Sequence, residues 1–459
     1  MSSMSRDANM SVVSRQQRTE PSLNWTTCTA LLCAHMLIGF VASDSGAIIT
    51  AHAAVTTVIA VWVVATTSRI GVVLTCAAYV VGSEVFWRLP GATVPWMWGT
   101  YLASALLIGG WFRLIRAKAD IAPMAFLACL APGAALTVLS SDLDTARDSL
   151  AFNISGPVLL AVTVSVCSRI RSTREGVERL LWWLVAATLL VSGAAISAAP
   201  RLAALDFTSE SNLATSAGFG PNQVSLVLGV GVVATLLIVL CNSRPSTTVL
   251  ATAVLLLLVT QAVLTFSRTG PFLAVLAAVA AVVGGSRSIP RAVSNLTRGA
   301  LVVVVLVLLI GPRIESLTGG QASQRFGTAQ TSHRDEIAAA DLSIFADYPL
   351  LGTGVGGSPE ARARHGLRGS PSHTEQTRLL AEHGLFGLVA LALLIYMAVQ
   401  AVRRQVSAPG RRWALCWAIW SLAAMTVAAN RLGVVPYAFG LGAILILPEP
   451  QSETRSSTP

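Results

Sequence analysis

The feature that most constrains this chain is a succession of apolar segments separated by short polar connections. The sequence has about fourteen such segments of about 15 to 25 residues, and roughly 20 residues of apolar helix cross the hydrocarbon core of a bilayer. Only 12% of the residues are charged and 54% are hydrophobic, whereas soluble domains carry about 25% charged residues. These proportions exclude a water-soluble fold. We expect an all-α, polytopic membrane helix bundle of about 12 to 14 transmembrane helices with one large extracytoplasmic loop.

One long polar connection divides the expected helices into two groups. We expect a disordered cytoplasmic tail over 1–22, transmembrane helices 1–11 within 23–312, an extracytoplasmic catalytic loop over 313–376, transmembrane helices 12–14 within 377–447 and a cytoplasmic tail over 448–459. The expected spans are 25–43, 47–67, 70–87, 96–112, 121–139, 150–168, 178–199, 221–241, 247–266, 270–285, 298–312, 377–402, 413–429 and 432–447.

The basic residues are distributed unevenly between the two sides of this expected bundle. The net charge is +10, from 32 basic and 22 acidic residues. If the N-terminus is cytoplasmic, twenty basic residues fall on the cytoplasmic side, five fall in short outer connections, and seven belong to the long loop and its border. Short cytoplasmic loops are rich in Lys and Arg, and long loops do not count in this rule. We therefore predict a multi-pass protein of the cytoplasmic (inner) membrane with both termini cytoplasmic, and the basic excess requires no nucleic acid.

The loop over 313–376 is longer and more polar than any other connection, and loops of this length are usually functional. Ser332 followed by Asp335 resembles a helix N-terminus. Apolar residues then recur at helical spacing before Pro349, at Ile337, Ala340, Ile344 and Phe345. We expect an amphipathic helix near the outer membrane surface.

Two arginines of the expected outer face are candidate anion-binding residues. Arg268, in Ser267-Arg268-Thr269-Gly270, lies between two apolar segments, where an arginine is unfavourable unless it meets an anion or water. The alternative is snorkelling of the side chain to the interface. Arg334 opens the expected loop helix, and taken alone it is better explained as a solvated surface charge. A guanidinium group binds phosphate in a bidentate manner.

His373 is the candidate proton acceptor, because histidine is the side chain best suited to accept a proton near neutral pH. It precedes the helix that we expect from residue 377, within two or three turns of Arg378 and Glu382. The alternative is a surface histidine in a mobile loop. His365, which lies among several arginines of the same loop, is a second and weaker candidate.

Three further features have a structural and a functional interpretation. Glu84 lies inside an apolar segment, and an ion pair with Arg88 four residues later is favoured over a functional site. Asn222 opens an expected helix, and capping is favoured over a place in the site. The glycines between 352 and 357 are better explained by a tight turn than by a nucleotide-binding loop, since no strand precedes them, although a backbone anion nest stays open.

In their order and spacing these motifs resemble the O-antigen ligase and O-antigen polymerase family of bacterial polytopic membrane glycosyltransferases. The resemblance spans roughly residues 220 to 400. The matching elements are Gly220-Pro221-Asn222, Ser267-Arg268-Thr269-Gly270, Arg334 followed by Pro349, Gly352 and Gly354, and His373 followed by Glu382, Gly384 and Gly387. Thr374 departs from the pattern, because the family commonly has Asn after the histidine.

The resemblance implies a glycan donor on undecaprenyl diphosphate, a reaction at the outer face without a nucleotide sugar, and an inverting attack on the anomeric carbon. By the same resemblance His373 is the base that activates an acceptor hydroxyl, and Arg268 and Arg334 bind the diphosphate. Asn222, Arg378 and Glu382 are supporting candidates. No metal and no cofactor is implied, and the expected partners are the lipid-linked donor, a glycan or lipid-glycan acceptor and membrane lipids.

Two other classes of protein fit the composition. A lipid-linked oligosaccharide flippase has a similar number of spans, but transporters often show related halves and polar groups near the bilayer midplane, and this chain shows a large outer loop instead. A scaffold for other glycan enzymes is the third hypothesis. Polymerase and ligase share the donor and differ in the acceptor. Because no acceptor-binding domain is visible, polymerase is slightly favoured.

Overall fold

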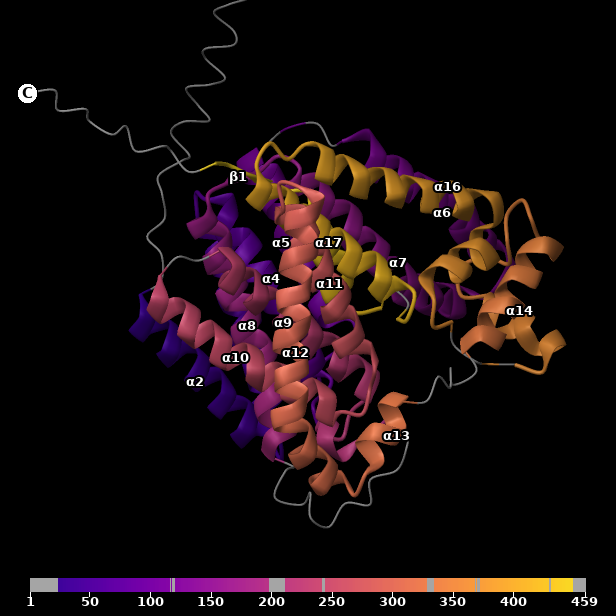
Figure 1. Cartoon of the computed structure of the whole chain (residues 1–459). Helices are drawn as coiled ribbons and strands as arrows, with labels where there is room; N and C mark the ends of the chain where they lie inside the picture. The colour runs from indigo at the N-terminus through magenta and orange to yellow at the C-terminus, as the bar shows by residue number, and fades with distance from the viewer. Residues whose placement is uncertain are drawn as a thin grey trace, which may run out of the picture.

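A computed structural model of the chain shows a bundle of long helices (Figure 1). It describes residues 24–115, 117, 120–197, 211–241, 244–327, 334–367, 369, 372–428 and 431–448. The expected tail over 1–22, nearly all of the tail over 448–459 and the expected helix start at Ser332 lie outside the described residues.

Each of the fourteen expected spans overlaps one helix of the structure, so the all-α expectation is confirmed. These helices are α2 (Trp25–Ala42), α3 (Gly46–Thr66), α4 (Ile70–Trp87), α5 (Trp98–Gly110), α6 (Ile121–Ser140), α7 (Leu143–Cys167), α8 (Arg174–Ser197), α9 (Pro221–Cys241), α10 (Pro245–Leu264), α11 (Thr269–Gly285), α12 (Ile289–Thr318), α16 (Glu375–Arg403), α17 (Ala408–Met425) and α18 (Val434–Leu441). The π-helical turn η1 (Trp111–Ile115) follows α5, and the short 3-10 helix η3 (Ala214–Ser216) precedes α9.

The protein is a multi-pass membrane protein. Within the described residues, nine helices are long and apolar enough to cross a bilayer: α2, α3, α4, α6, α7, α8, α9, α10 and α16. Of the other helices in expected spans, α11 is apolar but has only 17 residues. By length and composition, the part of the chain that the structure describes thus contains nine such helices, and the sequence predicts 12 to 14.

The centre of the bundle is formed by α8 and α9, which are buried along most of their length. A helix that is apolar on all sides belongs inside a bundle. α8 packs against α2, α4 and α9, and small residues bring two of these backbones close together. A Cβ atom at Gly39 of α2 would lie 2.0 Å from Leu190 O, and one at Gly193 of α8 would lie 2.2 Å from Met36 O. Close helix contacts at small residues are typical of membrane bundles.

The peripheral helices expose apolar side chains. In α3, Val58 and Trp62 are 68% and 64% exposed, and in α11 Phe272 is 70% exposed. A large surface of such exposed apolar side chains is unfavourable in water. Against lipid tails the same surface is favourable. The outer faces of α3 and α11 are therefore suited to contact lipid.

Two short strands are the one departure from the all-α expectation among the described residues. β1 (Arg171–Ser172), between α7 and α8, pairs in parallel with β2 (Leu445–Ile446), which follows α18. The pairing joins the α7–α8 connection to the last described segment of the chain.

The long connection is itself mostly helical. α12 continues to Thr318, so the connection begins later than the expected residue 313. It contains α13 (Gln321–Gly327), α14 (Arg334–Asp347), α15 (Ser358–Ala361) and the 3-10 helix η4 (Arg362–His365). Figure 1 shows α12 running from top to bottom along the front of the bundle, α13 to the right of its lower part and α14 at the right edge, where it packs on α16.

The expected loop helix is present as α14, but its apolar side faces the protein. Ile337, Ala340 and Ile344 are buried, and α14 packs on α16 and on η4. The expectation of a helix in the loop is thus confirmed, and α16 provides part of the surface that buries its apolar side.

Candidate active site

The turn between α10 and α11 carries Arg268 and is tied to the start of α9. Ser267 Oγ donates a hydrogen bond to Asn222 Oδ1 at 2.7 Å, and the backbone N–H of Gly270 donates to Ser225 Oγ at 2.9 Å. A Cβ atom at Gly270 would lie 2.1 Å from Ser225 O, so this close approach requires glycine. Asn222 lies inside α9 and links it to the turn. The expectation that Asn222 caps the helix is wrong.

Arg268 and Arg334 belong to one cluster of guanidinium groups, together with Arg325 of α13. Arg268 Nε donates to the backbone oxygen of Arg325 at 2.9 Å, and Arg325 Nε donates to the backbone oxygen of Phe266 at 2.8 Å. Arg334 is half-buried at the start of α14. Burial, and then the charges of Arg325 and Arg268, lower the pKa of Arg334. Like charges so close together stabilise an anion that binds among them.

His373 lines a cavity of about 270 Å³ next to this cluster. The cavity wall combines side chains from the start of α9, from inside α7, from the connection between α4 and α5, and from the segments that follow α17 and precede α16 and α18. Its residues are Arg88, Trp96, Phe152, Gly220, Pro221, Asn222, Gln223, Ser372, His373, Val427, Ala428, Arg431 and Leu432. The sequence candidates His373 and Asn222 thus share one wall, whereas Arg268 and Arg334 do not line the cavity itself.

The imidazole of His373 is held in its neutral form. Burial, followed by the positive charges of Arg334, Arg431 and Arg362, lowers the pKa of His373 from its usual value near 6.5. A neutral imidazole has one nitrogen that accepts a proton. His373 can therefore act as a base at neutral pH. His365, the weaker candidate, is exposed on η4 and is not among the residues that line this cavity.

Arg378 and Glu382 form part of a buried ion-pair network and do not line the cavity. Arg378 Nη2 donates to Glu375 Oε1 at 2.6 Å, and Arg378 Nη1 donates to Glu382 Oε2 at 2.6 Å. The side chains of all three are at most 2% exposed. Ser358 Oγ also donates to Glu382 Oε1 at 2.9 Å. Glu382 therefore fastens the segment around α15 to the first turns of α16, and Arg378 pairs with Glu382 within α16.

A second half of the network reaches α14. Arg362 Nε donates to Asp341 Oδ1 at 2.7 Å with both side chains fully buried. Arg362 Nη2 donates to Ser358 Oγ at 3.0 Å and to Ser372 Oγ. Thr377 Oγ1 donates to the other oxygen of Asp341 at 2.9 Å. Because Ser372 immediately precedes His373, the network sets the position of the candidate base.

Thr374 is linked to the same network through Thr377. Its hydroxyl is hydrogen-bonded to that of Thr377, which in turn donates to Asp341. Thr374 stands where the family that this sequence resembles commonly has Asn. It directly precedes α16, and its side chain contacts Thr377 of the first turn.

The glycine-rich segment between α14 and α15 is a tight turn against the membrane helices, as the sequence predicts. Thr353 N donates to Ala381 O at 2.9 Å, and Gly354 N donates to Glu382 O at 3.1 Å. Gly352 has a φ of +70°, and a Cβ atom there would lie 2.4 Å from the carbonyl carbon of Glu382. Since these amides already bind carbonyl oxygens, they are not directed at an anion, and the alternative of a backbone nest is disfavoured here.

Glu84 and Arg88 form the expected ion pair, at 2.6 Å between Arg88 Nη2 and Glu84 Oε1, with both side chains buried. Glu84 also accepts hydrogen bonds from Thr100 Oγ1 at 2.9 Å and from Gly433 N at 2.7 Å. Arg88 stacks on the Trp96 ring at 4.8 Å and lines the cavity beside His373. The pair is thus structural, and it also holds one wall of the cavity.

Sequence reasoning missed several residues of the site. Arg431 and Arg362 carry no local signal that sets them apart from the other arginines, and the pattern around Arg88 predicts only its ion pair with Glu84 and not its place in the cavity wall. Gln223 follows the singled-out Asn222 directly, and the two line the same cavity. No local pattern links Asp341 to Arg362, because their contact joins two separate helices.

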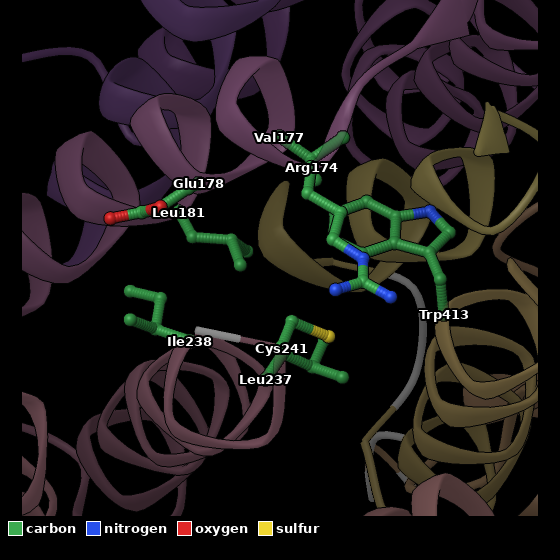
Figure 2. A pocket seen from close by; sticks show the side chains of 8 residues that line it. All are labelled: Arg174, Val177, Glu178, Leu181, Leu237, Ile238, Cys241 and Trp413. Carbon is green, nitrogen blue, oxygen red and sulfur yellow. The ribbon is translucent and has the colours of Figure 1, made fainter. Parts of the chain in front are cut away.

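A second cavity lies between the start of α8 and the end of α9 (Figure 2). The His373 cavity lies at the opposite end of α9, where the helix begins. It is lined by Arg174, Glu178, Cys241 and Trp413, among others. Its volume of about 20 Å³ holds a single water molecule. It is too small for a glycan and contains none of the predicted site residues.

Fold and site together define a polytopic membrane protein with a basic cluster and a neutral histidine beside a cavity that both polar and apolar side chains line. Comparison with family models identifies residues 251–392 as matching the family described as O-antigen ligase. The match covers roughly a third of the chain, including Arg268, Arg334, His373, Arg378 and Glu382, and it confirms the family resemblance that the sequence predicts. A search of curated proteins finds no match to the chain.

Proposed function

We propose that the protein transfers a glycan from undecaprenyl diphosphate to an acceptor hydroxyl at the outer face of the cytoplasmic membrane, and that it polymerises lipid-linked glycan. The observation that carries this proposal is the neutral, half-buried His373, which lies beside a cluster of guanidinium groups and lines a cavity with both polar and apolar side chains. A base and an anion-binding cluster side by side are what displacement of a diphosphate leaving group needs. The family match supports the same membrane glycan chemistry.

Each group has one role in the proposed reaction. The acceptor hydroxyl loses its proton to His373, and its oxygen attacks the anomeric carbon of the donor. The bond from that carbon to the diphosphate oxygen breaks on the opposite side, so the configuration inverts. Undecaprenyl diphosphate leaves with the electron pair, and Arg268 and Arg334 stabilise the negative charge that grows on it. These arginines supply the positive charge for the leaving group.

The supporting residues Asn222, Arg378 and Glu382 hold other groups of the site in place. Asn222 accepts a hydrogen bond from Ser267 and lines the cavity, so it keeps the turn that carries Arg268 beside this cavity. Arg378 and Glu382 belong to the ion-pair network that holds Ser372 and His373. The arginine distribution favours both termini in the cytoplasm, which places this site on the extracytoplasmic side.

The test is the glycan length distribution in cells that lack the protein and are complemented with wild type, His373→Ala or His365→Ala. Wild type and His365→Ala are expected to restore long chains. His373→Ala at equal abundance is expected to leave single repeat units on the lipid at the outer face. If His373→Ala restores the wild-type pattern in full, the catalytic assignment is wrong, and the flippase or scaffold hypothesis gains.

A further inference from the structure

The cavity beside His373 has a wall that the proposed donor chemistry does not use. Arg268 and Arg334 lie outside it, whereas Trp96, Phe152, Gln223, Arg88 and Arg431 line it. Two of the five are aromatic, two are basic and one is an amide. At about 270 Å³ the cavity lies just below the usual range of ligand pockets, roughly 300–1,000 Å³. It can receive part of a substrate, of the size of a sugar residue.

The aromatic side chains present flat apolar surfaces beside the polar groups of the cavity. Trp96 is 47% exposed, with Arg88 at 4.8 Å from its ring centroid and the Phe219 ring at 5.6 Å. Arg431 lies at 4.9 Å over the Phe152 ring. Pockets that combine aromatic surfaces with a few placed polar groups suit ligands that have both apolar and polar faces. A sugar ring has such faces: its C–H groups pack on the indole while its hydroxyls bind the polar groups.

Two buried polar atoms in this wall have no partner among the described residues. They are Gln223 Oε1, an acceptor, and Arg431 Nε, a donor. Leaving such an atom unpaired costs about 1–3 kcal/mol, and most buried polar atoms in proteins are paired. A ligand that offers a hydroxyl to Gln223 and an oxygen to Arg431 satisfies both atoms.

The two arginines of the wall differ in charge balance. Arg88 is neutralised by Glu84 at 2.6 Å and donates to the backbone oxygen of Arg431 at 3.3 Å, so it holds the Arg431 segment in place. Arg431 Nη2 donates to the amide oxygen of Asn153 at 3.3 Å, and within the described residues no carboxylate lies at ion-pair distance from it. Glu375 and Glu382, the nearest acidic groups that act on Arg431, are both paired with Arg378.

We propose that this wall is the acceptor subsite, that Trp96 packs against an acceptor sugar ring, and that Arg431 binds an anionic group of the acceptor. This inference rests on the proposed glycan transfer and names the acceptor class: a saccharide with an anionic oxygen group. The anion has two sources, a carboxylate on an acidic sugar or the phosphate of a lipid-linked acceptor. In both, an acceptor anchored by Arg431 presents its hydroxyl to His373 in the same cavity.

Equilibrium binding to the full-length protein in detergent tests the subsite without turnover. The probes are methyl β-glucuronide, the neutral methyl β-glucoside and inorganic diphosphate. The variants are His373→Ala, Arg431→Gln, Arg431→Lys and Trp96→Ala, with Arg364→Gln as a control on an exposed arginine of η4. Ligand-observed NMR reports each dissociation constant, and thermal unfolding verifies that each variant is folded.

Wild type, His373→Ala and Arg364→Gln are expected to bind the glucuronide at least tenfold more tightly than the glucoside. Arg431→Gln is expected to remove this preference, Arg431→Lys to retain most of it, and Trp96→Ala to weaken both sugars. If diphosphate binding instead depends on Arg431 and the sugar preference is absent, the anion is the carrier phosphate, and the subsite stands.

If Arg431→Gln, folded, changes neither glucuronide nor diphosphate binding, the proposal is wrong. The proposed function can fail separately, because Arg431-dependent binding together with normal glycan synthesis by His373→Ala would remove the catalytic assignment and leave the subsite.

Discussion

Two groups of charged side chains lie within the same region of the molecule and differ in how their charges are balanced. In the network of Asp341, Arg362, Glu382, Arg378 and Glu375, each carboxylate has a guanidinium partner and every side chain is at most 2% exposed. Around the cavity, Arg334 and Arg431 have no ion-pair partner within the described residues, and His373 is half-buried. The first group holds the loop, and the second is free to bind a substrate.

This difference shows that the role of an arginine in the long connection cannot be read from the sequence alone. Arg362 and Arg334 lie in the same connection, yet one is fully buried against a carboxylate and the other is half-buried among like charges. A paired buried charge costs energy when its partner is removed. Like charges held close together are stabilised when an anion binds among them. Substitutions should therefore separate the two groups by what they damage, stability or activity.

The largest expected effect on stability is that of Asp341→Ala. This change leaves Arg362 buried without its carboxylate, and breaking a buried pair costs about 3–5 kcal/mol. The matched control is Asp347→Ala at the end of the same helix, whose 3.7 Å pair with Arg364 is exposed and is worth about 1 kcal/mol or less. Thermal unfolding in detergent should show a large drop in Tm for Asp341→Ala only. Equal Tm values would mean that the network does not hold the loop.

Arg334→Gln is expected to lower the rate of glycan transfer with little change in Tm. The variant removes one positive charge from the site of the growing diphosphate charge, and loss of one such stabilising group costs about 2.7–4 kcal/mol, or roughly 10²–10³-fold in rate. Arg364→Gln, on the exposed η4, serves as the control. A variant that unfolds early, or one that transfers glycan at the wild-type rate, would place Arg334 outside the binding group.

The smallest effect concerns the pH profile. Burial and the charges of Arg334, Arg431 and Arg362 lower the pKa of His373 below its usual 6.5, so the neutral base persists as pH falls and is lost only below that value. Arg334→Gln removes one of these charges, and the pKa of His373 should rise. The acid limb of kcat/KM against pH should then shift to higher pH. An unchanged limb would show that the Arg334 charge does not reach His373.

Sequence reasoning reached the membrane fold, and it singled out several residues of the candidate site, for identifiable physical reasons. Apolar segments of spanning length predict helices directly, as the fourteen matched positions show. His373 and Asn222 were found because their residue types and neighbours are unusual at the ends of apolar segments. The partner of Arg362 could not be found, because Asp341 lies on another helix and only tertiary packing joins them. For the same reason Asn222 was expected to cap α9, although it reaches Ser267 of a distant turn.

The central claim, that His373 is the base of a lipid-linked glycan transfer, is tested most directly in proteoliposomes that hold the purified full-length protein. Undecaprenyl-diphosphate-linked glycan is supplied as donor and acceptor, and the initial rate of product formation is measured for wild type, His373→Ala and His365→Ala. The account predicts equal rates for wild type and His365→Ala, and a rate roughly 10²–10⁴-fold lower for His373→Ala. Transfer by His373→Ala at the wild-type rate would contradict it.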